Sequence, residues 1–542
     1  MNEPRQIVVV GGVAGGMSFA TRMRRLDEHA RITVIERSGH VSFANCGLPY
    51  YVGGVIPQRS SLLLQTPESL AERFRLEVQV LTEVTDIDTA TRTVTLLDLA
   101  QGTTSTLHYD ELVLSPGARP ITPPLPGIER ALVLRDVEDT DALTQAVAGA
   151  GTAAVIGGGF IGLEVAENLV ARGLHVSVVE AGEQVMAPLD PEMAAIVHER
   201  LREHGVELLL GRSAAAIGEH EVRLDDGREL PADLVVAAIG VRPDTRLAEA
   251  AGITVGPRGG IVVDDQLRTS DEHIHAVGDA VEKLDGLTQE STLVPLANTA
   301  NRQGRVLADI LAGLGGHDRP TLATAIVGVF GLQVAATGWS EKRLRAAGLP
   351  ARVIHTHPFS HATYYPGARP MALKLLVDPE TDTILGAQGV GEDGVDKRID
   401  VIATAISGGL TASRLADLEL AYAPAFGSAK DPVNMLGWVD QNLAGGTTTS
   451  IQWHELDAAL AAGAHLVDVR SREEFEAGAI PGALNIPVDE LRQRLDELPE
   501  GDLVVHCAVG VRGHTAARLL SQAGRSVANL DGGYKTWRTA TR

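Results

Sequence analysis

The sequence predicts an α/β protein of several domains, because three kinds of segment follow one another along its 542 residues. Near residues 6–36 and again near 152–180, an apolar strand leads into a glycine-rich turn, a helix and a second strand that ends in a glutamate. From about residue 323 the pattern becomes that of an antiparallel sheet with a helix packed on it. After the Gly- and Thr-rich stretch 442–450, which predicts a flexible linker, α/β alternation starts again.

Composition and charge limit the function. A hydrophobic content of 44% is that of a soluble globular protein, and the length predicts three or four domains at roughly 150 residues each. The net charge of −23 argues against a nucleic-acid-binding protein. The two cysteines cannot form a disulfide framework, and we find no basic leader and no apolar run of the roughly 20 residues that a membrane span needs. We therefore expect a cytoplasmic protein that has no membrane segment.

The second glycine turn carries the G-x-G-x-x-G pattern in Gly157, Gly159 and Gly162. The first glycine allows a tight turn, the second lets a pyrophosphate approach the backbone, and the third lets the helix close on the strand. Glu180 ends the next strand, where it can bond both ribose hydroxyls and repel a 2′-phosphate. We therefore predict a nicotinamide cofactor here, NADH rather than NADPH. Its expected contacts are Gly157, Gly159, Phe160, Ile161, Gly162, Glu180 and Gly240.

The first turn has Val13 where the second glycine is expected, so a plain glycine turn is the competing interpretation. Two later segments favour a flavin dinucleotide. The segment LVLSPGARP resembles the one that joins the domains of two-dinucleotide flavoproteins, and HIHAVGDA resembles the strand whose aspartate, here Asp279, holds the flavin ribityl chain. By this resemblance Glu36 holds the adenosine ribose of FAD. The expected FAD contacts are Gly11, Gly12, Val13, Ala14, Gly15, Gly16, Glu36, Arg37, Gly117, Gly278, Asp279 and Ala280.

Cys46 lies in SFANCGLPYY, which resembles the active-site motif of coenzyme A-disulfide reductases. The first 440 residues resemble the single-cysteine branch of the pyridine nucleotide–disulfide reductases. Glutathione and lipoamide reductases have a second cysteine five residues on, where this chain has Tyr51. The resemblance implies that Cys46 forms a mixed disulfide with an outside thiol or becomes a sulfenic acid. A helix is expected directly after Gly47, and its N-terminus would lower the pKa of the thiol.

The same resemblance implies a substrate site. Ser42 and Asn45 would contact the thiol substrate, and Arg22 and Arg25 would bind coenzyme A phosphates, although they can also be ordinary surface arginines. Lys430 matches a lysine near the coenzyme A end.

Two tyrosines are expected to act on the cysteine of a partner subunit. They are Tyr364 and Tyr422 in the segments HATYYPGARP and AYAPAFGSAKD, with Tyr365 as an alternative to the first. Their phenols could protonate or hold a departing thiolate. This role requires a homodimer; the competing interpretation is that both tyrosines are interface residues.

Residues 452–542 resemble a rhodanese domain in LVDVRSREEFEAGAIPGALNIP, HCAVGVRG and NLDGGYKTW, with Ala479 where a histidine is common. Cys507 begins the reactive loop, Arg512 lies near its end, and a helix is expected to start near Gly513. Backbone N–H groups of residues 508–512 could hold a thiolate or persulfide anion. The loop is one residue shorter than that of cysteine-dependent phosphatases, which favours sulfur chemistry. The competing interpretation is an inactive docking module.

These features predict a chain with an FAD domain, an NADH domain, an α+β dimerisation domain and an α/β rhodanese domain. We expect a reductase that uses NADH to reduce coenzyme A disulfide, coenzyme A persulfide or polysulfide, and no metal site. Two alternatives stay open: an NADH oxidase or peroxidase, disfavoured because Ala14 stands where those enzymes often have histidine, and a sulfur-carrier or redox-sensing flavoprotein. The expected domains are 1–115 with 241–322 (FAD), 116–240 (NADH), 323–441 (dimerisation), 442–451 (linker) and 452–542 (rhodanese).

Overall fold

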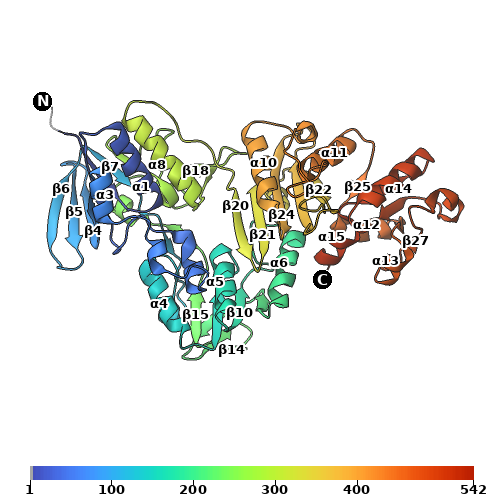
Figure 1. Ribbon diagram of the computed structural model, residues 1–542, viewed down its shortest axis with the longest axis horizontal. Coiled ribbons are helices and arrows are strands. Elements are labelled where there is room, and N and C mark those ends of the chain that lie inside the picture. Colours follow the sequence, from blue (N-terminus) through green and yellow to red (C-terminus); the bar gives the residue numbers. More distant parts are fainter. Residues whose placement is uncertain (1–3, 542) are drawn as a thin grey trace. The chain divides into compact units, whose positions relative to one another are not determined.

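A computed structural model describes residues 4–541 and divides the chain into two compact units (Figure 1). Unit 1 is formed by the residues up to Glu183 and by Gly205–Ala323. Unit 2 is formed by Gln184–His204 and by the residues from Thr324 onward.

The first sheet of unit 1 is parallel and five-stranded, in the order β17-β7-β1-β2-β3. Its strands are β1 (Gln6–Val10), β2 (Arg31–Ile35), β3 (Glu77–Gln79), β7 (Glu111–Leu114) and β17 (Ile274–Ala276). Helices α1 (Ala14–Leu26) and α8 (Ala297–Leu311) pack together on one face, around Ile7, Val9 and Phe19. The antiparallel strands β4 (Thr82–Asp88), β5 (Thr93–Asp98) and β6 (Thr104–His108) supply part of the core on the other face. The parallel sheet is therefore covered on both faces, which fits the continuous apolar sequence of its central strand β1.

The second sheet of unit 1 repeats the arrangement with four parallel strands, in the order β11-β10-β9-β15. Its strands are β9 (Thr152–Ile156), β10 (His175–Glu180), β11 (Glu207–Leu210) and β15 (Leu234–Ala237). Helix α4 (Val137–Val147) precedes β9 in the chain, and α5 (Phe160–Ala171) connects β9 to β10. The antiparallel strands β12 (Ala214–Ile217), β13 (Glu221–Leu224) and β14 (Glu229–Pro231) pack against it. Both predicted strand–turn–helix–strand repeats are confirmed.

The two sheets of unit 1 are connected by an antiparallel strand pair, β8 (Ala118–Pro120) with β16 (Val241–Pro243). Gly117 and Gly240 directly precede these strands, with φ of +70° and +107°. The shorter elements of the unit are α2 (Leu48–Val52), α3 (Pro67–Phe74), α7 (Arg246–Ala250), β18 (Lys283–Leu284) and β19 (Ser291–Thr292).

Unit 2 contains the antiparallel sheet expected from residue 323 on, in the order β20-β21-β24-β23-β22. Its strands are β20 (Ala325–Val329), β21 (Leu332–Gly338), β22 (Arg352–Thr356), β23 (Met371–Val377) and β24 (Ile384–Gly391). The helices of this part are α6 (Pro191–Glu203), α9 (Glu341–Ala346), α10 (Val395–Ser407) and α11 (Pro432–Ala444). Residues of α10 and α11 share one apolar core with the central strands, including Leu375, Ile402 and Leu436.

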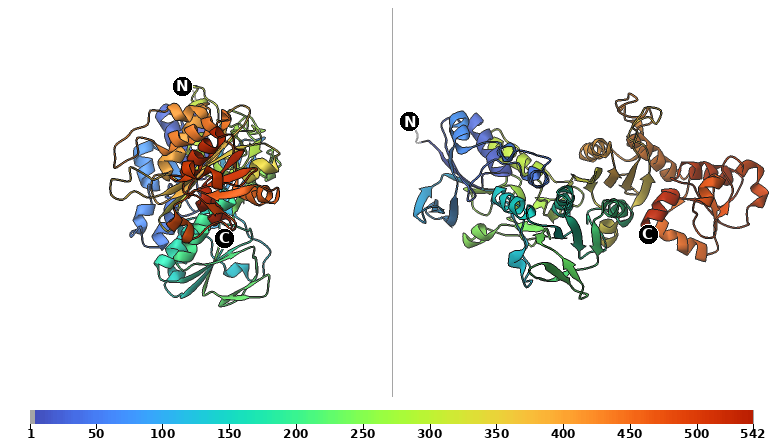
Figure 2. Two further views of the ribbon diagram at one scale, coloured as in Figure 1. Left: turned by 90° about the vertical axis from the view of Figure 1, so that its right-hand side faces the viewer. Right: turned by 60° about the horizontal axis from the view of Figure 1, so that its bottom comes forward.

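The C-terminal part of unit 2 is a parallel sheet in the order β25-β29-β28-β26-β27. Its elements are β25 (Ser450–Ile451), α12 (Leu456–Ala461), β26 (His465–Asp468), α13 (Arg472–Glu476), β27 (Leu484–Asn485), β28 (Leu503–His506), α14 (Val511–Gln522), β29 (Val527–Leu530) and α15 (Gly533–Ala540). Helix α15 lies on the side of this sheet that faces α6 (Figures 1 and 2). The predicted linker is shorter than expected, because α11 extends to Ala444 and β25 starts at Ser450, which leaves residues 445–449 between elements.

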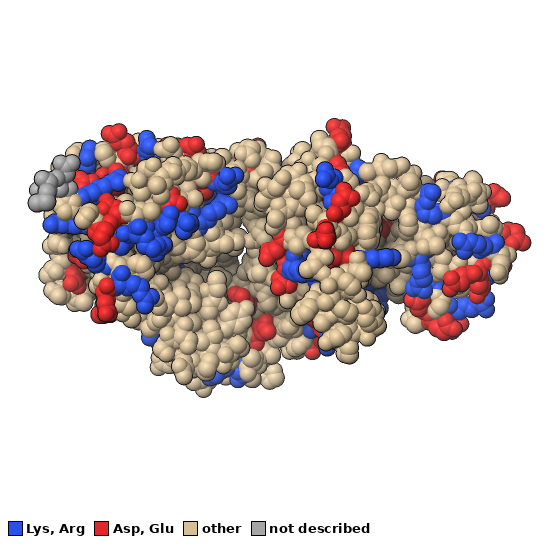
Figure 3. All heavy atoms as spheres, turned by 45° about the horizontal axis from the view of Figure 1, so that its top comes forward, with Lys and Arg blue, Asp and Glu red and all other residues tan. Residues whose placement is uncertain are grey.

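Basic and acidic side chains are interspersed on the face shown in Figure 3, although the chain as a whole is acidic. Among the described residues, we find no helix with the length and apolar content needed to cross a bilayer.

Candidate functional site

The two glycine turns of unit 1 are built alike. Gly11 and Gly157 have φ of +98° and +112°, in the region that favours glycine. A Cβ atom at Gly11 would lie 2.1 Å from the carbonyl oxygen of Ser115, and one at Gly157 would lie 2.3 Å from that of Ala238. Any other residue would clash with the neighbouring strand, so both turns require glycine at their first position.

The last glycine of each pattern brings helix and turn together. A Cβ atom at Gly16 would lie 2.0 Å from the carbonyl oxygen of Gly11, and one at Gly162 would lie 2.0 Å from that of Gly157. By contrast, a Cβ atom at Gly159 would have no atom within 4 Å. The backbone in front of α5 is therefore open to a ligand, as a pyrophosphate site at a helix N-terminus requires.

The glutamates that end the second strands point back at these turns. Glu36 Oε2 accepts a hydrogen bond of 2.8 Å from the N–H of Gly12, and Glu180 Oε2 accepts one of 2.7 Å from Gly158. The other oxygen of Glu180 accepts a bond of 2.7 Å from the N–H of Gly182. Both carboxylates thus lie where this fold binds the adenosine ribose.

Asp279 lies in a short 3₁₀ turn, Gly278–Ala280, after β17, and its Oδ1 atom is buried with no hydrogen-bond partner. Burial raises the pKa of this carboxyl group. A buried, unpartnered carboxylate oxygen is costly unless a ligand donates to it. A flavin ribityl hydroxyl would do so, and the described residues therefore fit FAD.

Lys283 is a neighbour that the sequence interpretation missed. Its Nζ donates a bond of 2.7 Å to the carbonyl oxygen of Gly278, and burial lowers its pKa to about 8. Arg37, one of the expected FAD contacts, forms an ion pair of 3.6 Å with Asp244. The Lys283 contact spans only five residues, whereas the ion pair of Arg37 with Asp244 joins segments far apart along the chain and has no signal in the local sequence.

The loop that carries Cys46 is tied to the first glycine turn. Ser42 has φ of +49°, unusual for a residue other than glycine, and its N–H donates a bond of 2.8 Å to the carbonyl oxygen of Gly12. Cys46 follows in a 3₁₀ turn, Asn45–Gly47, and both Asn45 and Cys46 are exposed. The structure therefore brings Ser42 to the dinucleotide turn and leaves the thiol open to an outside molecule.

The pKa of the Cys46 thiol is raised, which contradicts the expected effect of the following helix. Removal from water by the surrounding protein is the main cause, followed by the negative charges of Glu164 and Asp279. The helix α2 does start at Leu48, but it spans only five residues. Its dipole does not outweigh two nearby carboxylates.

Glu164 is a second residue that the sequence interpretation missed, although it lies just after the glycine pattern of α5. Its Oε1 accepts a hydrogen bond of 3.0 Å from the hydroxyl of Tyr50. Burial raises the pKa of Glu164, and burial together with Glu164 raises the pKa of Tyr50. The negative charge of Glu164 thus adds to the effect of burial in raising the pKa of the Cys46 thiol.

The two arginines expected to bind coenzyme A phosphates have different surroundings on α1. Arg22 Nε donates a bond of 2.8 Å to Oδ1 of Asp309 on α8, so its charge is already paired. Arg25 is exposed, with its guanidinium carbon 5.9 Å from the ring centre of Phe74. Arg25 therefore has the more available charge.

In unit 2 the hydroxyl groups of Tyr364 and Tyr422 form a hydrogen bond of 2.7 Å. The two side chains are 74% and 47% exposed, and Phe426 beside them in sequence is 76% exposed. Tyr365 instead packs its ring edge-on against His361, with centroids 5.7 Å apart. Tyr365 is itself 45% exposed, so the hydrogen bond between their hydroxyl groups is what distinguishes Tyr364 and Tyr422. Lys430 is exposed as well.

Cys507 follows β28 and is 1% exposed. Its Sγ accepts a hydrogen bond of 3.1 Å from the N–H of Gly510, which has φ of +109°. The next helix, α14, begins at Val511, two residues earlier than expected. The loop therefore places a backbone donor on the sulfur, as a thiolate or persulfide site requires.

Arg512 is held in place by Glu474 of α13. Its Nη1 and Nη2 donate bonds of 2.6 and 2.7 Å to the two carboxylate oxygens. This pairing lowers the pKa of Glu474 to about 2 and raises the pKa of Arg512. Much of the positive charge in the loop is therefore balanced before any anion enters.

Three family descriptions match the chain. Residues 5–304 match "Pyridine nucleotide-disulphide oxidoreductase", residues 324–432 match the dimerisation domain of that family, and residues 452–540 match "Rhodanese-like domain".

Several known proteins are similar over most of their length. Coenzyme A disulfide reductase of Staphylococcus haemolyticus is 34% identical over 442 residues, which are 81% of this chain and 100% of that protein. The crystal structure of reduced Bacillus anthracis CoADR-RHD is 48% identical with a TM-score of 0.97 and covers 99% of this chain and 98% of its own. The structure of a NAD-dependent persulfide reductase from A. fulgidus is 39% identical with a TM-score of 0.93, covering 98% and 100%.

The family implies FAD and NAD(P)H, which agrees with the two glycine turns, their glutamates and the unpartnered oxygen of Asp279. The chain thus belongs to the pyridine nucleotide-disulphide oxidoreductase family and is an oxidoreductase with a C-terminal rhodanese-like domain.

Proposed function

We propose that this chain is an NADH-dependent reductase of coenzyme A disulfide, coenzyme A persulfide or polysulfide, and that it acts through Cys46. The observation that supports this most directly is the exposed thiol of Cys46, which lies beside a dinucleotide turn. The motif around Cys46 contains no second cysteine. The only other cysteine of the sequence is Cys507, in the rhodanese-like domain. The names of the similar proteins support coenzyme A disulfide and persulfide as substrates.

In the proposed reaction the Cys46 thiolate attacks one sulfur of the substrate disulfide. The substrate S–S bond breaks, a thiolate leaves, and Cys46 forms a mixed disulfide with the other half. FAD, when bound, supplies the two electrons from NADH that cleave this mixed disulfide. With a persulfide substrate, the products are the free thiol and hydrogen sulfide.

Other residues of the chain bind the substrate or its leaving group. Tyr364 and Tyr422 would donate a proton or a hydrogen bond to the departing thiolate of a partner subunit, because their hydroxyl groups are exposed and paired. This role requires a homodimer, which the match to a dimerisation domain supports. The proposed substrate contacts are Ser42, Asn45, Arg22, Arg25 and Lys430.

The cofactor contacts follow from the two turns. Gly11, Gly12 and Asp279 would hold FAD, with Glu36 on its ribose, and the turn at Gly157 would hold NADH. We assign NADH rather than NADPH because the Glu180 carboxylate is fixed by two backbone N–H groups where a 2′-phosphate would have to lie. The negative charge of Glu180 would repel the negative 2′-phosphate of NADPH and so disfavour its binding.

The rhodanese-like domain would carry sulfane sulfur on Cys507, next to Arg512 and the Gly510 N–H. The reducing cytoplasm suits such free thiols. We assign residues 1–115 and 241–322 to the FAD domain, 116–240 to the NADH domain, 323–441 to the dimerisation domain and 452–542 to the rhodanese domain.

The test is anaerobic NADH consumption by the FAD-loaded protein with coenzyme A disulfide, coenzyme A persulfide and polysulfide in separate assays. We expect turnover with at least one of them and its loss in Cys46→Ser, while Cys507→Ser keeps disulfide reduction. Undiminished turnover of Cys46→Ser would refute the proposal. Oxygen uptake that outpaces thiol production in air would instead indicate an NADH oxidase.

A further inference from the structure

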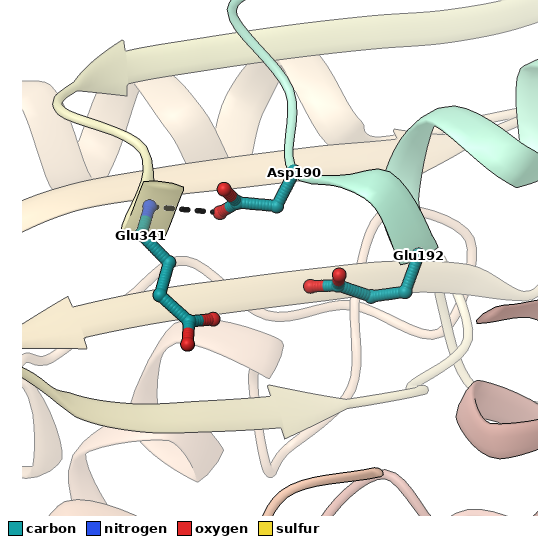
Figure 4. Close-up of side chains that lie close together, drawn as sticks. All are labelled: Asp190, Glu192 and Glu341. Carbon is teal, nitrogen blue, oxygen red and sulfur yellow. Dashed lines mark hydrogen bonds between the residues drawn. The ribbon is translucent and has the colours of Figure 1, made fainter. Parts of the chain in front are cut away.

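Three acidic residues of unit 2 lie close together in a buried position. They are Asp190 and Glu192 at the start of α6 and Glu341 at the start of α9, and their carboxylate oxygens lie within 4.8 Å of one another (Figure 4). Such a group suggests a metal site, but Lys374 of β23 already fills it. Lys374 Nζ lies 2.5 Å from Glu192, 2.6 Å from Glu341 and 3.0 Å from Asp190, and the side chain is fully buried.

His355 of β22 extends this cluster to the rhodanese-like domain. Its Nε2 lies 3.0 Å from Oε1 of Glu192, and its Nδ1 lies 2.8 Å from Oδ2 of Asp531, which follows β29. A neutral imidazole has one N–H donor, so two carboxylate partners favour the protonated ring. The same Oδ2 also accepts from the backbone N–H of His355 at 2.9 Å and from Nε2 of Gln452 at 3.2 Å. Strand β22 therefore holds the Asp531 carboxylate firmly.

Asp531 opens the turn that holds the reactive loop of the rhodanese-like domain. Gly532 and Gly533 follow with φ of +67° and +61°. Tyr534 N–H then donates a bond of 2.8 Å to the carbonyl oxygen of Cys507, and Lys535 N–H donates one of 2.9 Å to that of Ala508.

Space around this turn is tight on both sides. A Cβ atom at Gly533 would lie 2.5 Å from the carbonyl oxygen of Cys507, and one at Gly532 would lie 3.1 Å from Cβ of His355. The turn 531–535 is therefore packed between β22 and the start of the reactive loop. A shift of Asp531 would be transmitted to Cys507 across very few atoms.

We propose that His355 is a positioning residue for sulfur transfer at Cys507, because it fixes Asp531 and thereby the turn 531–535 that holds the reactive loop. The proposal rests on the proposed sulfane-sulfur role of Cys507. In the transfer step the Cys507 thiolate attacks the outer sulfur of a low-molecular-weight persulfide, whose S–S bond breaks. The donor leaves as a thiolate, and the sulfur and its proton remain on Cys507 as a persulfide, with no net oxidation or reduction.

The competing explanation is that the buried cluster only stabilises the contact between two parts of unit 2. The two explanations differ in which reactions they affect. A purely stabilising role predicts that loss of His355 acts on folding and on all activities alike. A positioning role predicts a change at Cys507 in a protein that stays folded and still reduces coenzyme A disulfide.

The experiment compares His355→Gln with a matched control, His275→Gln. His275 is also buried and also bonds a carboxylate, Glu111, at 3.0 Å, but it lies in unit 1. Sulfur transfer from cysteine persulfide to cyanide is followed in a Cys46→Ser background, where Cys507 is the only cysteine. Coenzyme A disulfide reduction is measured in the same variants with Cys46 intact, and folding by circular dichroism.

We expect His355→Gln to lower kcat of sulfur transfer by about 10- to 100-fold with little change in KM, since small displacements of a reacting group have effects of that order. Disulfide reduction should stay within about twofold of the parent. The His275→Gln control should keep the parent rate of sulfur transfer. The double variant His355→Gln/Asp531→Asn restores a neutral hydrogen-bonded pair and should recover part of the lost rate.

Iodoacetamide alkylation gives a readout that does not depend on turnover. Because Cys507 is buried, alkylation in the Cys46→Ser background should become faster in His355→Gln and remain unchanged in His275→Gln. Unchanged alkylation and sulfur transfer in folded His355→Gln would overturn the proposal, and so would an equal loss of both activities. If the parent shows no Cys507-dependent sulfur transfer, the proposed function of this domain is wrong and the positioning role falls with it.

Discussion

The hydroxyl groups of Tyr364 and Tyr422 lie 2.7 Å apart although the residues are far apart in the sequence and both side chains reach the surface. The hydrogen bond raises the pKa of Tyr364. One of the two phenols must donate and the other must accept, so the pair presents a single free hydroxyl proton to a ligand. A pair of this kind suits the protonation of a leaving thiolate.

Removal of either hydroxyl should therefore slow disulfide reduction. We expect Tyr364→Phe and Tyr422→Phe each to lower kcat by roughly 100-fold, the usual effect of losing a general acid. Tyr365→Phe is the matched control, because this residue packs on His361 and should keep near-normal activity. Steady-state NADH oxidation with coenzyme A disulfide measures all three. Equal activity of Tyr364→Phe and Tyr365→Phe would contradict the assignment.

Glu164→Gln should lower the pKa of the Cys46 thiol, since the negative charge of Glu164 disfavours the thiolate. The pH dependence of iodoacetamide alkylation in a Cys507→Ser background reports this pKa directly. The alkylation profile should shift to lower pH in Glu164→Gln and remain in place in Glu167→Gln, which lies on the same helix. A profile that does not move would show that Glu164 has no influence on the thiol.

Glu180→Ala should weaken the preference for NADH over NADPH. Removing the carboxylate leaves the N–H groups of Gly158 and Gly182 free to donate to a 2′-phosphate. We expect the ratio of kcat/KM for NADPH to that for NADH to rise by about tenfold or more, equivalent to ~1.4 kcal/mol. Equal kcat/KM of the parent protein for NADH and NADPH would contradict the predicted preference for NADH.

The His355 cluster predicts a pH-dependent stability of unit 2. Hydrogen bonds to Asp531 and Glu192 outweigh burial and the charge of Lys374, and they raise the pKa of His355 to about 9. The folded state therefore binds this proton more tightly than the unfolded state. Its stabilisation is complete below about pH 6.5, decreases as pH rises, and is lost once pH passes about 9.

The measurement is the thermal unfolding midpoint of the parent and of His355→Gln between pH 6 and pH 10. The stability advantage of the parent should shrink as pH rises, by on the order of 3 kcal/mol over the whole titration. His275→Gln serves as the control. A gap between parent and His355→Gln that is constant across this range would contradict the shifted pKa.

Glu474→Gln should improve the use of dianionic sulfur donors by Cys507. The bidentate contact to Arg512 balances the arginine charge, so a dianion such as thiosulfate gains little attraction at this loop. We expect kcat/KM for thiosulfate to rise relative to that for cysteine persulfide. Glu490→Gln removes an exposed carboxylate paired with Arg494 and should change neither value. A fall for both donors would show that Glu474 supports the loop and does not select the donor.

Much of the fold could be predicted from sequence because its signals are local. A glycine with positive φ, such as Gly11 or Gly157, can be recognised from the strand–turn–helix pattern of its own segment. A glutamate at the end of the second strand, such as Glu180, is placed by the strand itself. The rhodanese-like loop is likewise contiguous, so Cys507, Gly510 and Arg512 are near one another in any folded form of the segment.

Only the tertiary structure decided the pKa and charge balance of the reactive residues, because these depend on charges that folding brings together from distant segments. Burial, together with the charges of Glu164 and Asp279, raises the pKa of Cys46 against the expected effect of the helix, and Glu474 balances the charge of Arg512. His355 and Asp531 meet only after two domains have folded. The sequence by itself determined the turns, strands and reactive groups, because backbone sterics and periodicity act over a few residues. Electrostatic energies act through space and depend on burial, so only the folded chain sets the pKa and the position of each reactive group.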